Sequence, residues 1–98
     1  MHNIRYTQLA RDDLFNIFEI IASDKQSVAI EYIFKLEEYI ELLESNPKMG
    51  VECKKKNINQ NCRVLIYQNY LIFYILQKNE VHILRVLNSK RDYKKYFK

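Results

Sequence analysis

The stretch from residue 61 to residue 87, NCRVLIYQNYLIFYILQKNEVHILRVL, constrains the fold most because it is β-forming almost without interruption. Val, Ile, Tyr and Phe dominate it, and it contains neither Gly nor Pro. Two polar pairs, Gln68-Asn69 and Lys78-Asn79, divide it into three runs of strand length. We therefore expect three antiparallel strands joined by two tight hairpins.

The register of this meander follows if each polar pair is a two-residue turn. The turns themselves are weak signals, because neither is Asn-Gly or Asp-Gly, although Asn tolerates the left-handed conformation that such turns need. The expected cross-strand pairs are Tyr67 with Tyr70, Leu65 with Ile72, Arg63 with Tyr74, Tyr74 with Ile83, and Ile72 with Arg85.

Side chains alternate across a strand, so this register divides the sheet into two faces. One face, which includes Val64, Phe73 and Leu84, is almost wholly apolar, and we expect the rest of the chain to cover it. The other face mixes aliphatic groups with two arginines and three tyrosines, a composition that suits phosphates, bases or an acidic partner. A longer first turn would slip the register and exchange the two faces. The polar members of the mixed face are Arg63, Tyr67, Tyr70, Tyr74 and Arg85.

Two amphipathic helices are expected before this sheet. Thr7 is a suitable helix N-cap, and apolar residues then recur at helical spacing as far as Ala22. Asp24 or Ser27 could cap the second helix. The two helices form a hairpin, and their apolar stripes are the natural cover for the apolar sheet face.

The sequence also predicts where the helical region ends and what flanks it. The second helix should end near Ser45, because Asn46 precedes Pro47 and the residue before a proline is disfavoured in the helical conformation. Residues 2–6 are compatible with a short additional strand, and residues 47–60 form a loop region that contains Lys54-Lys55-Lys56. The predicted fold is therefore α+β, with a short N-terminal strand and a helical hairpin packed on an antiparallel β-meander.

The 98 residues suffice for one domain, spanning residues 1–98, with a modest two-layer core. There is no run of about 18 apolar residues and no basic-then-apolar leader, so neither a membrane span nor a secretory signal is expected. The cytoplasm is the expected compartment. Cys53 and Cys62 lie nine residues apart with no neighbouring His or Cys pair to complete a zinc site, so we expect reduced thiols, no metal and no cofactor.

The charge is divided unequally along the chain. Through Ser45 there are four Lys/Arg and nine Asp/Glu, giving 4 − 9 = −5, whereas from Asn46 onward there are twelve and three, giving 12 − 3 = +9. A solvated surface is one interpretation, but the cations coincide with the mixed sheet face and with the tail at residues 88–98. The C-terminal half is therefore expected to meet an anion.

The order of short strand, two helices, three-stranded meander and basic tail resembles the RelE/ParE family of bacterial toxins from type II toxin-antitoxin systems. The segments that carry the resemblance are YTQLARDDLFNIFEII at residues 6–21, NPKMG at residues 46–50, NYLIFYIL at residues 69–76 and ILRVLNSKRD at residues 83–92. The resemblance implies a growth-inhibiting, plasmid-stabilising type of toxin that is neutralised by a cognate antitoxin. It also implies one of two targets: ParE-like members inhibit DNA gyrase, and RelE-like members are ribosome-dependent endoribonucleases that cut messenger RNA.

A nuclease needs a group to accept the proton of the 2′-hydroxyl, a group to protonate the leaving oxygen and fixed cations near the phosphate. Many family members carry a histidine where this chain has Asn88, and an asparagine cannot exchange a proton near neutral pH. NPKMG and ILRVLNSKRDYKKYF also look closer to ParE-like patterns. We therefore favour the gyrase interpretation and keep the endoribonuclease as the alternative. A general nucleic-acid-binding module would explain the basic half but not the acidic helical hairpin.

No catalytic residue is assigned from the sequence. Arg63 and Arg91 are the strongest candidates for function; the tyrosines could instead be buried packing residues, and Arg85 could pair with an acidic group of the helices. The candidate target-binding or phosphate-binding residues are Arg63, Tyr74, Arg85, Lys90, Arg91, Tyr93 and Tyr96.

Overall fold

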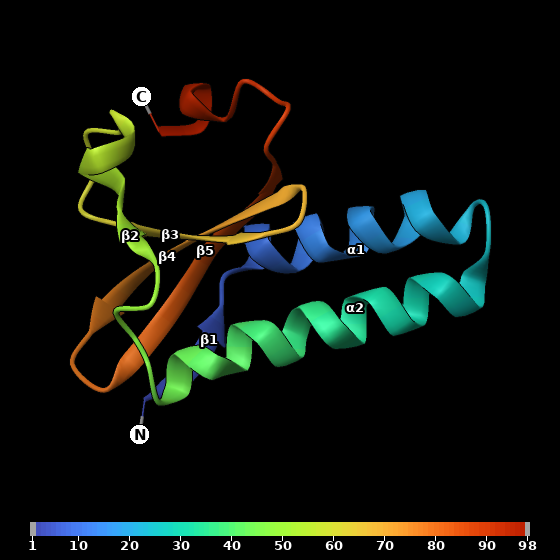
Figure 1. Ribbon diagram of the computed structural model, residues 1–98, viewed down its shortest axis with the longest axis horizontal. Helices are drawn as coiled ribbons and strands as arrows, with labels where there is room; N and C mark the ends of the chain where they lie inside the picture. Colours follow the sequence, from blue (N-terminus) through green and yellow to red (C-terminus); the bar gives the residue numbers. More distant parts are fainter. Residues whose placement is uncertain (1, 98) are drawn as a thin grey trace.

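The computed structural model describes residues 2–97, apart from the side chains of Lys94 and Phe97. Two helices and a five-stranded mixed sheet make up the fold (Figure 1), which confirms the predicted α+β class. The strands lie in the order β1-β5-β4-β3-β2, with β1 parallel to β5 and the other neighbours antiparallel. The elements are β1 (Asn3–Tyr6), α1 (Gln8–Ala22), α2 (Gln26–Glu41), η1 (Leu42–Glu44), β2 (Val51–Glu52), η2 (Cys53–Lys56), β3 (Arg63–Tyr67), β4 (Tyr70–Gln77), β5 (Glu80–Asn88) and η3 (Tyr93–Phe97).

Helix α1 begins and ends where the sequence predicts. The side chain of Thr7 accepts a hydrogen bond from the Ala10 N–H at 3.1 Å, which satisfies one of the free donors of the first helical turn. The same hydroxyl donates to the carbonyl of Leu84 at 2.9 Å. Thr7 therefore both caps the helix and attaches it to strand β5.

Helix α2 begins after Lys25, so the predicted cap at Asp24 or Ser27 is wrong. The N–H groups of Asp24 and Lys25 both donate to the Ile21 carbonyl, at 3.1 and 3.0 Å. These main-chain bonds close the turn between the helices without a side-chain cap. The helix passes into η1 and ends at Glu44, next to the predicted end near Ser45.

The first hairpin has the predicted register, and the second departs from it at a bulge. Tyr74 pairs with Ile83 as expected, but Phe73 pairs with Arg85, so Leu84 is an extra residue in β5. Ile72 consequently pairs with Val86 rather than with Arg85, which corrects the prediction. In both turns it is the first residue, Gln68 or Lys78, that has a positive φ, at 52° and 53°, and not the asparagine.

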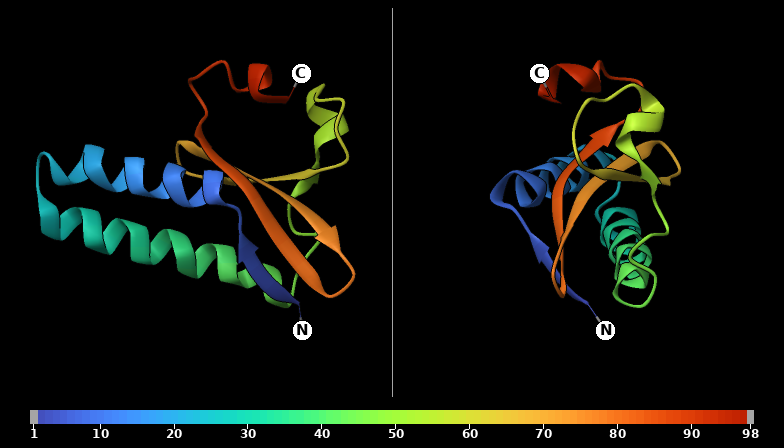
Figure 2. Two further views of the ribbon diagram at one scale, coloured as in Figure 1. Left: turned by 180° about the vertical axis from the view of Figure 1, so that it is seen from behind. Right: turned by 90° about the vertical axis from the view of Figure 1, so that its left-hand side faces the viewer.

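The helices cover the mixed face of the sheet, so the prediction that they cover the almost wholly apolar face is wrong. Figures 1 and 2 show α1 and α2 on one side of the sheet and η2 with the C-terminal segment on the other. The mixed face can be buried because its polar groups find partners within the fold, as described below. The buried core between helices and sheet consists of Ala10, Ile17, Leu36, Ile40, Leu43, Leu65, Ile72, Tyr74, Val81, Ile83 and Val86.

The other sheet face has a second core beneath η2 and η3. It consists of Cys53, Ile58, Cys62, Val64, Leu71, Phe73 and Leu87, with Ile75, Leu84 and Tyr93 packed against it. Cys53 and Cys62 form a disulfide, with their Cα atoms 5.3 Å apart, so the expectation of reduced thiols is wrong. The cause is the pairing of β2 with β3: Val51 lies opposite Val64 and Glu52 opposite Arg63, which places the two cysteines next in register.

No helix within residues 2–97 is long and apolar enough to cross a membrane.

Candidate functional site

Arg63 supports the turn between α2 and β2. Its Nη1 donates to the carbonyl of Gly50 at 2.7 Å and, more weakly, to that of Lys48 at 3.4 Å. A guanidinium carries five N–H donors, so these bonds leave others available. Arg63 is half-buried and lies at the start of β3.

Tyr74 is fully buried, which corrects its assignment as a target-binding residue. Its hydroxyl donates to the Pro47 carbonyl at 2.8 Å and accepts from the Gly50 N–H at 2.9 Å. Burial raises the pKa of the phenol, opposed by the Gly50 hydrogen bond and by the charge of Arg63. Gly50 is required at this contact, since a Cβ there would lie 2.8 Å from the Tyr74 ring and hydroxyl. Arg63 and Tyr74 thus form a structural group around residues 47–50.

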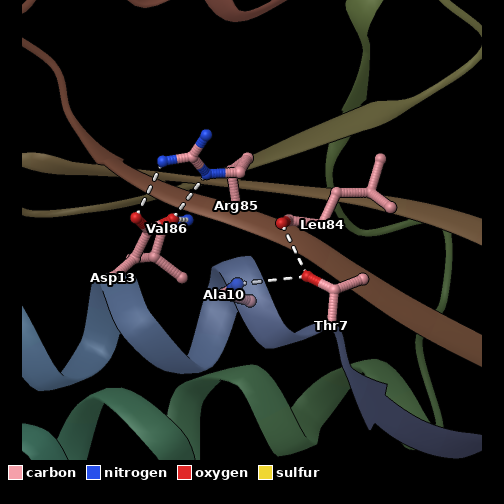
Figure 3. A network of polar contacts seen from close by, with 6 residues as sticks. All are labelled: Thr7, Ala10, Asp13, Leu84, Arg85 and Val86. Carbon is pink, nitrogen blue, oxygen red and sulfur yellow. Dashed lines mark hydrogen bonds and ion pairs between the residues drawn. The ribbon is translucent and has the colours of Figure 1, made fainter.

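Arg85 is held by Asp13, which confirms the interpretation that it pairs with an acid of the helices (Figure 3). Its Nε and Nη2 donate to the two Asp13 carboxylate oxygens at 2.8 and 2.9 Å, and the Val86 N–H donates to the same carboxylate at 2.9 Å. The hydrogen bond with Asp13 raises the pKa of Arg85 further above its ordinary value. The guanidinium carbon also lies 4.6 Å from the centre of the Tyr96 ring, a cation–π arrangement. Arg85 therefore joins helix α1, the bulge of β5 and the tail.

The tail begins with a turn fixed by Asn88. The Asn88 side chain accepts from the Lys90 N–H at 2.8 Å, and its carbonyl accepts from the Arg91 N–H at 3.1 Å. The Lys90 and Arg91 side chains are exposed. Arg91 lines a small pocket of about 80 Å³ between α1 and the end of β5, together with Asn16, Tyr70 and Asn88.

The aromatic residues of the tail attach it to the body of the molecule. Tyr93 is half-buried, with its ring 5.9 Å from that of Phe73. Tyr96 is 38% exposed beside Arg85. The predicted site residues consequently fall into two groups, Arg63 with Tyr74 around residues 47–50, and the rest at the end of β5 and in the tail. Within residues 2–97, no hydrogen bond or ion pair joins the two groups.

Two features of this region were not among the predicted site residues. Asp13 could have been noticed as an acid on the buried stripe of α1, between Ala10 and Ile17. The lysine run Lys54-Lys55-Lys56 was visible in the sequence, but its position was not. It lies in η2, whose chain covers the same sheet face as the tail. The structure thus brings basic residues from two distant segments to one side of the molecule, as Figures 1 and 2 show for η2 and η3.

Two groups that could take part in proton transfer, Tyr74 and His82, lie away from the tail. Burial raises the pKa of Tyr74, and burial with the neighbouring Tyr70 and Tyr67 phenols raises that of Tyr32 to about 12, so neither phenol is a base near neutral pH. His82 is bonded to Glu80 at 2.8 Å, at the beginning of β5, whereas Asn88 is the last residue of β5 and leads into the tail. What the site presents is fixed positive charge beside aromatic rings.

Comparison with known proteins identifies the family. The model for the ParE toxin of type II toxin-antitoxin systems, parDE, matches residues 4–93. The chain belongs to the ParE toxin family. It is therefore the toxin component of a type II system, with a cognate antitoxin as its partner, and the ParE-like interpretation holds over the RelE-like alternative.

A solved structure shares the ParE fold. It is described as the chromosomal ParDE TA system from P. aeruginosa, and its matching chain has a TM-score of 0.79 and 17% sequence identity to this toxin. The match covers 92% of this chain and 98% of the other. No curated protein sequence matches this ParE-family chain.

Proposed function

We propose that this ParE-family toxin acts in the cytoplasm by inhibiting DNA gyrase. The observation that carries the proposal is the ParE family match over residues 4–93, nearly the whole chain. The side chains support it: Arg85 is bonded to Asp13, and the neutral side chain of Asn88 is bonded to the main chain of the tail. An inhibitor needs a stable body that presents a basic, aromatic surface, and no acid–base pair.

The antitoxin is proposed to cover apolar residues on the helical hairpin. Phe15 is 61% exposed, Ile30 58% and Phe34 63%, so the hairpin offers apolar side chains that a partner can bury. The hairpin also carries most of the acidic residues, whereas the basic segments lie across the sheet. An antitoxin that reaches both sides should therefore be apolar where it meets the hairpin and acidic where it meets the tail.

The proposal is tested with purified gyrase in a supercoiling assay, beside a ribosome-programmed messenger cleavage assay. We expect loss of supercoiling or accumulation of cleaved DNA, with the messenger intact. The double variant Lys90→Ala and Arg91→Ala should weaken inhibition by about tenfold or more, since both side chains are exposed and each contact of a charged group contributes about 1–2 kcal/mol. The matched control, Arg11→Ala with Lys25→Ala, removes two exposed cations from the helical hairpin and should inhibit as wild type.

The outcome that contradicts the proposal is equally definite. Messenger cut in the presence of ribosomes, with gyrase fully active, would make the chain a RelE-like endoribonuclease despite Asn88. Stable expression of the isolated chain without any growth defect would count against both targets.

A further inference from the structure

We propose that the basic surface formed by η2 and the tail holds the phosphate backbone of duplex DNA. The surface is defined by Lys54, Lys55, Lys56, Lys90, Arg91 and Lys95, and is called the η2–tail surface below. The choice of duplex DNA rests on the proposed action at gyrase, an enzyme that works on that polymer.

The fold gathers these cations although more than thirty positions separate the two segments in sequence. Cys53 and Ile58 of the η2 segment and Tyr93 of η3 pack on one hydrophobic cluster around Phe73. Figures 1 and 2 show η2 and η3 side by side above the same sheet face in each view. The lysine run and η3 therefore rest on a shared core. The turn that carries Lys90 and Arg91 leads from β5 into η3 and borders the surface on the side of α1.

The charges of this surface are not neutralised within the fold. The ion pairs of residues 2–97 involve Arg5, Lys35, His82 and Arg85, and none involves a cation of the η2–tail surface. The acidic residues in these segments are Glu52 and Asp92, against the six cations named. Uncompensated positive charge of this density attracts a polyanion, and released counterions add to its binding free energy.

The surface is also held firmly, which limits the entropy lost when a ligand binds. The Cys53–Cys62 disulfide closes the segment that contains the lysine run, and the Cys53 N–H donates to the Cys62 carbonyl at 2.8 Å. Asn57 ends η2 in the left-handed conformation, with φ of 61°. On the tail side, the Tyr93 ring packs against Phe73 and the Tyr96 ring against Arg85.

A pocket at the base of η2 fits a single phosphate group. It has a volume of about 160 Å³, and its lining includes Lys54, Asn61 and Arg63. Lysine, arginine and amide N–H groups are the donors that proteins use for phosphate oxygens. Glu52 also lines the pocket, so the neighbouring lysines are needed to keep the local charge positive.

Phosphates, rather than base edges, are the expected contacts. Lys54, Lys55, Lys56 and Lys95 lie on short 3-10 turns, and Lys90 and Arg91 lie on the turn before η3. Within residues 2–97, no helix or two-stranded ribbon projects from this face to enter a groove. Binding should therefore be independent of sequence, weak at physiological salt and much tighter at low salt. The acidic helical hairpin lies across the sheet, so the toxin should approach DNA with the η2–tail surface foremost.

The test is fluorescence anisotropy of a mixed-sequence 24-base-pair duplex, about two helical turns long, titrated with the full-length toxin over a range of salt concentrations. One variant carries Lys54→Gln, Lys55→Gln and Lys56→Gln, and a second carries Lys90→Gln, Arg91→Gln and Lys95→Gln. The control carries Arg11→Gln, Lys25→Gln and Lys35→Gln, which removes three exposed charges from the helical hairpin. Circular dichroism and thermal unfolding establish that each variant is folded.

We expect each surface variant to bind at least about tenfold more weakly at low salt. The slope of log affinity against log salt should fall by about 2–3, since each phosphate that the protein no longer neutralises lowers it by about 0.9. The control should change affinity by less than about twofold. Equal losses in control and surface variants would overturn the proposal, because net charge alone would then explain binding. So would tighter binding of a duplex RNA or of polyglutamate than of DNA, or no binding of the wild-type toxin at low salt.

The assay contains no gyrase, so its failure is separable from that of the proposed function. A toxin that inhibits gyrase but does not bind DNA overturns the η2–tail assignment alone. A toxin that binds DNA through this surface but leaves gyrase active overturns the gyrase proposal alone.

Discussion

The carboxylate of Asp13 holds the guanidinium of Arg85 through two hydrogen bonds, of 2.8 and 2.9 Å, between residues 72 positions apart in the chain (Figure 3). Asp13 is 8% exposed, and its carboxylate also accepts the Val86 N–H. That N–H belongs to the irregular part of β5, next to the bulge at Leu84. One carboxylate thus fixes the helix, the bulge and the arginine on which the Tyr96 ring rests.

Replacing Asp13 should destabilise the fold strongly. Asp13→Asn keeps the size but loses the charge that pairs with Arg85, and we expect the free energy of unfolding to fall by about 2–4 kcal/mol. Urea denaturation measures this. Asp12→Asn, at the adjacent exposed position, should stay within about 0.5 kcal/mol of wild type. Similar losses in the two variants would show that the Asp13 contacts contribute little.

Reducing the disulfide should lower stability without unfolding the helical side of the molecule. Cys53 and Cys62 close a loop with a sequence separation of 9, for which the chain-entropy argument gives about 2–3 kcal/mol. We expect dithiothreitol to lower the melting temperature of the wild type. A Cys53→Ala, Cys62→Ala double variant should melt at the reduced value whether or not the reductant is present. A wild type indifferent to dithiothreitol would contradict this.

Stability should fall if a methyl group is added at Gly50 or if the hydroxyl of Tyr74 is removed. Gly50→Ala places a Cβ 2.8 Å from the Tyr74 ring, the Tyr74 hydroxyl and the Val64 carbonyl, and should cost about 1–3 kcal/mol. Tyr74→Phe leaves the Gly50 N–H and Pro47 carbonyl without their partner and should cost about 1–3 kcal/mol. Tyr70→Phe, in the same strand but half-buried, is the matched control for thermal unfolding.

Glu37 should make stability depend on pH in the weakly acidic range. Burial and the neighbouring carboxylate of Glu41 raise the pKa of Glu37 above its ordinary 4.5. Between that value and the raised one, the folded state binds more protons than the unfolded state, so this group's contribution to stability falls as pH rises. Glu37→Gln should therefore unfold at a higher temperature than wild type near neutral pH, and the difference should vanish below the ordinary pKa.

The control for this measurement is Glu38→Gln, at the next and exposed position of the same helix. It removes the same charge from α2 without the burial. If Glu37→Gln melted above wild type by the same amount at every pH, the charge of the helix, and not the raised pKa of Glu37, would explain the difference in melting temperature.

The elements that could be predicted are those whose causes are local. Thr7 caps α1 through a bond to Ala10, three residues away, and the polar pairs turn the chain between adjacent strands. The bulge at Leu84 could not be predicted, because nothing in the local pattern marks it. Strand β2, with its two residues, is too short to give an alternation signal.

The orientation of the sheet could not be predicted because both of its faces are apolar enough to be buried. The mixed face carries tyrosines and an arginine that look suited to solvent, yet the Tyr74 hydroxyl bonds the loop at residues 47–50 and Arg85 bonds Asp13. These partners lie 24 to 72 positions away, beyond any local pattern. The position of the lysine run depends on contacts of the same long-range kind. The basic character of the tail could be predicted from the sequence, but the position of Lys54 on the same side of the sheet could not.

The attachment of the N-terminal segment has a consequence for the synthesis of the toxin. Strand β1 pairs with residues 80–83, the Thr7 hydroxyl bonds Leu84 and the Asp13 carboxylate bonds Arg85 and Val86, so the first part of the chain is fastened by nearly the last part. A nascent chain therefore cannot complete its core until β5 has emerged from the ribosome. Translation that stops before that strand releases an unfinished chain in place of a folded toxin.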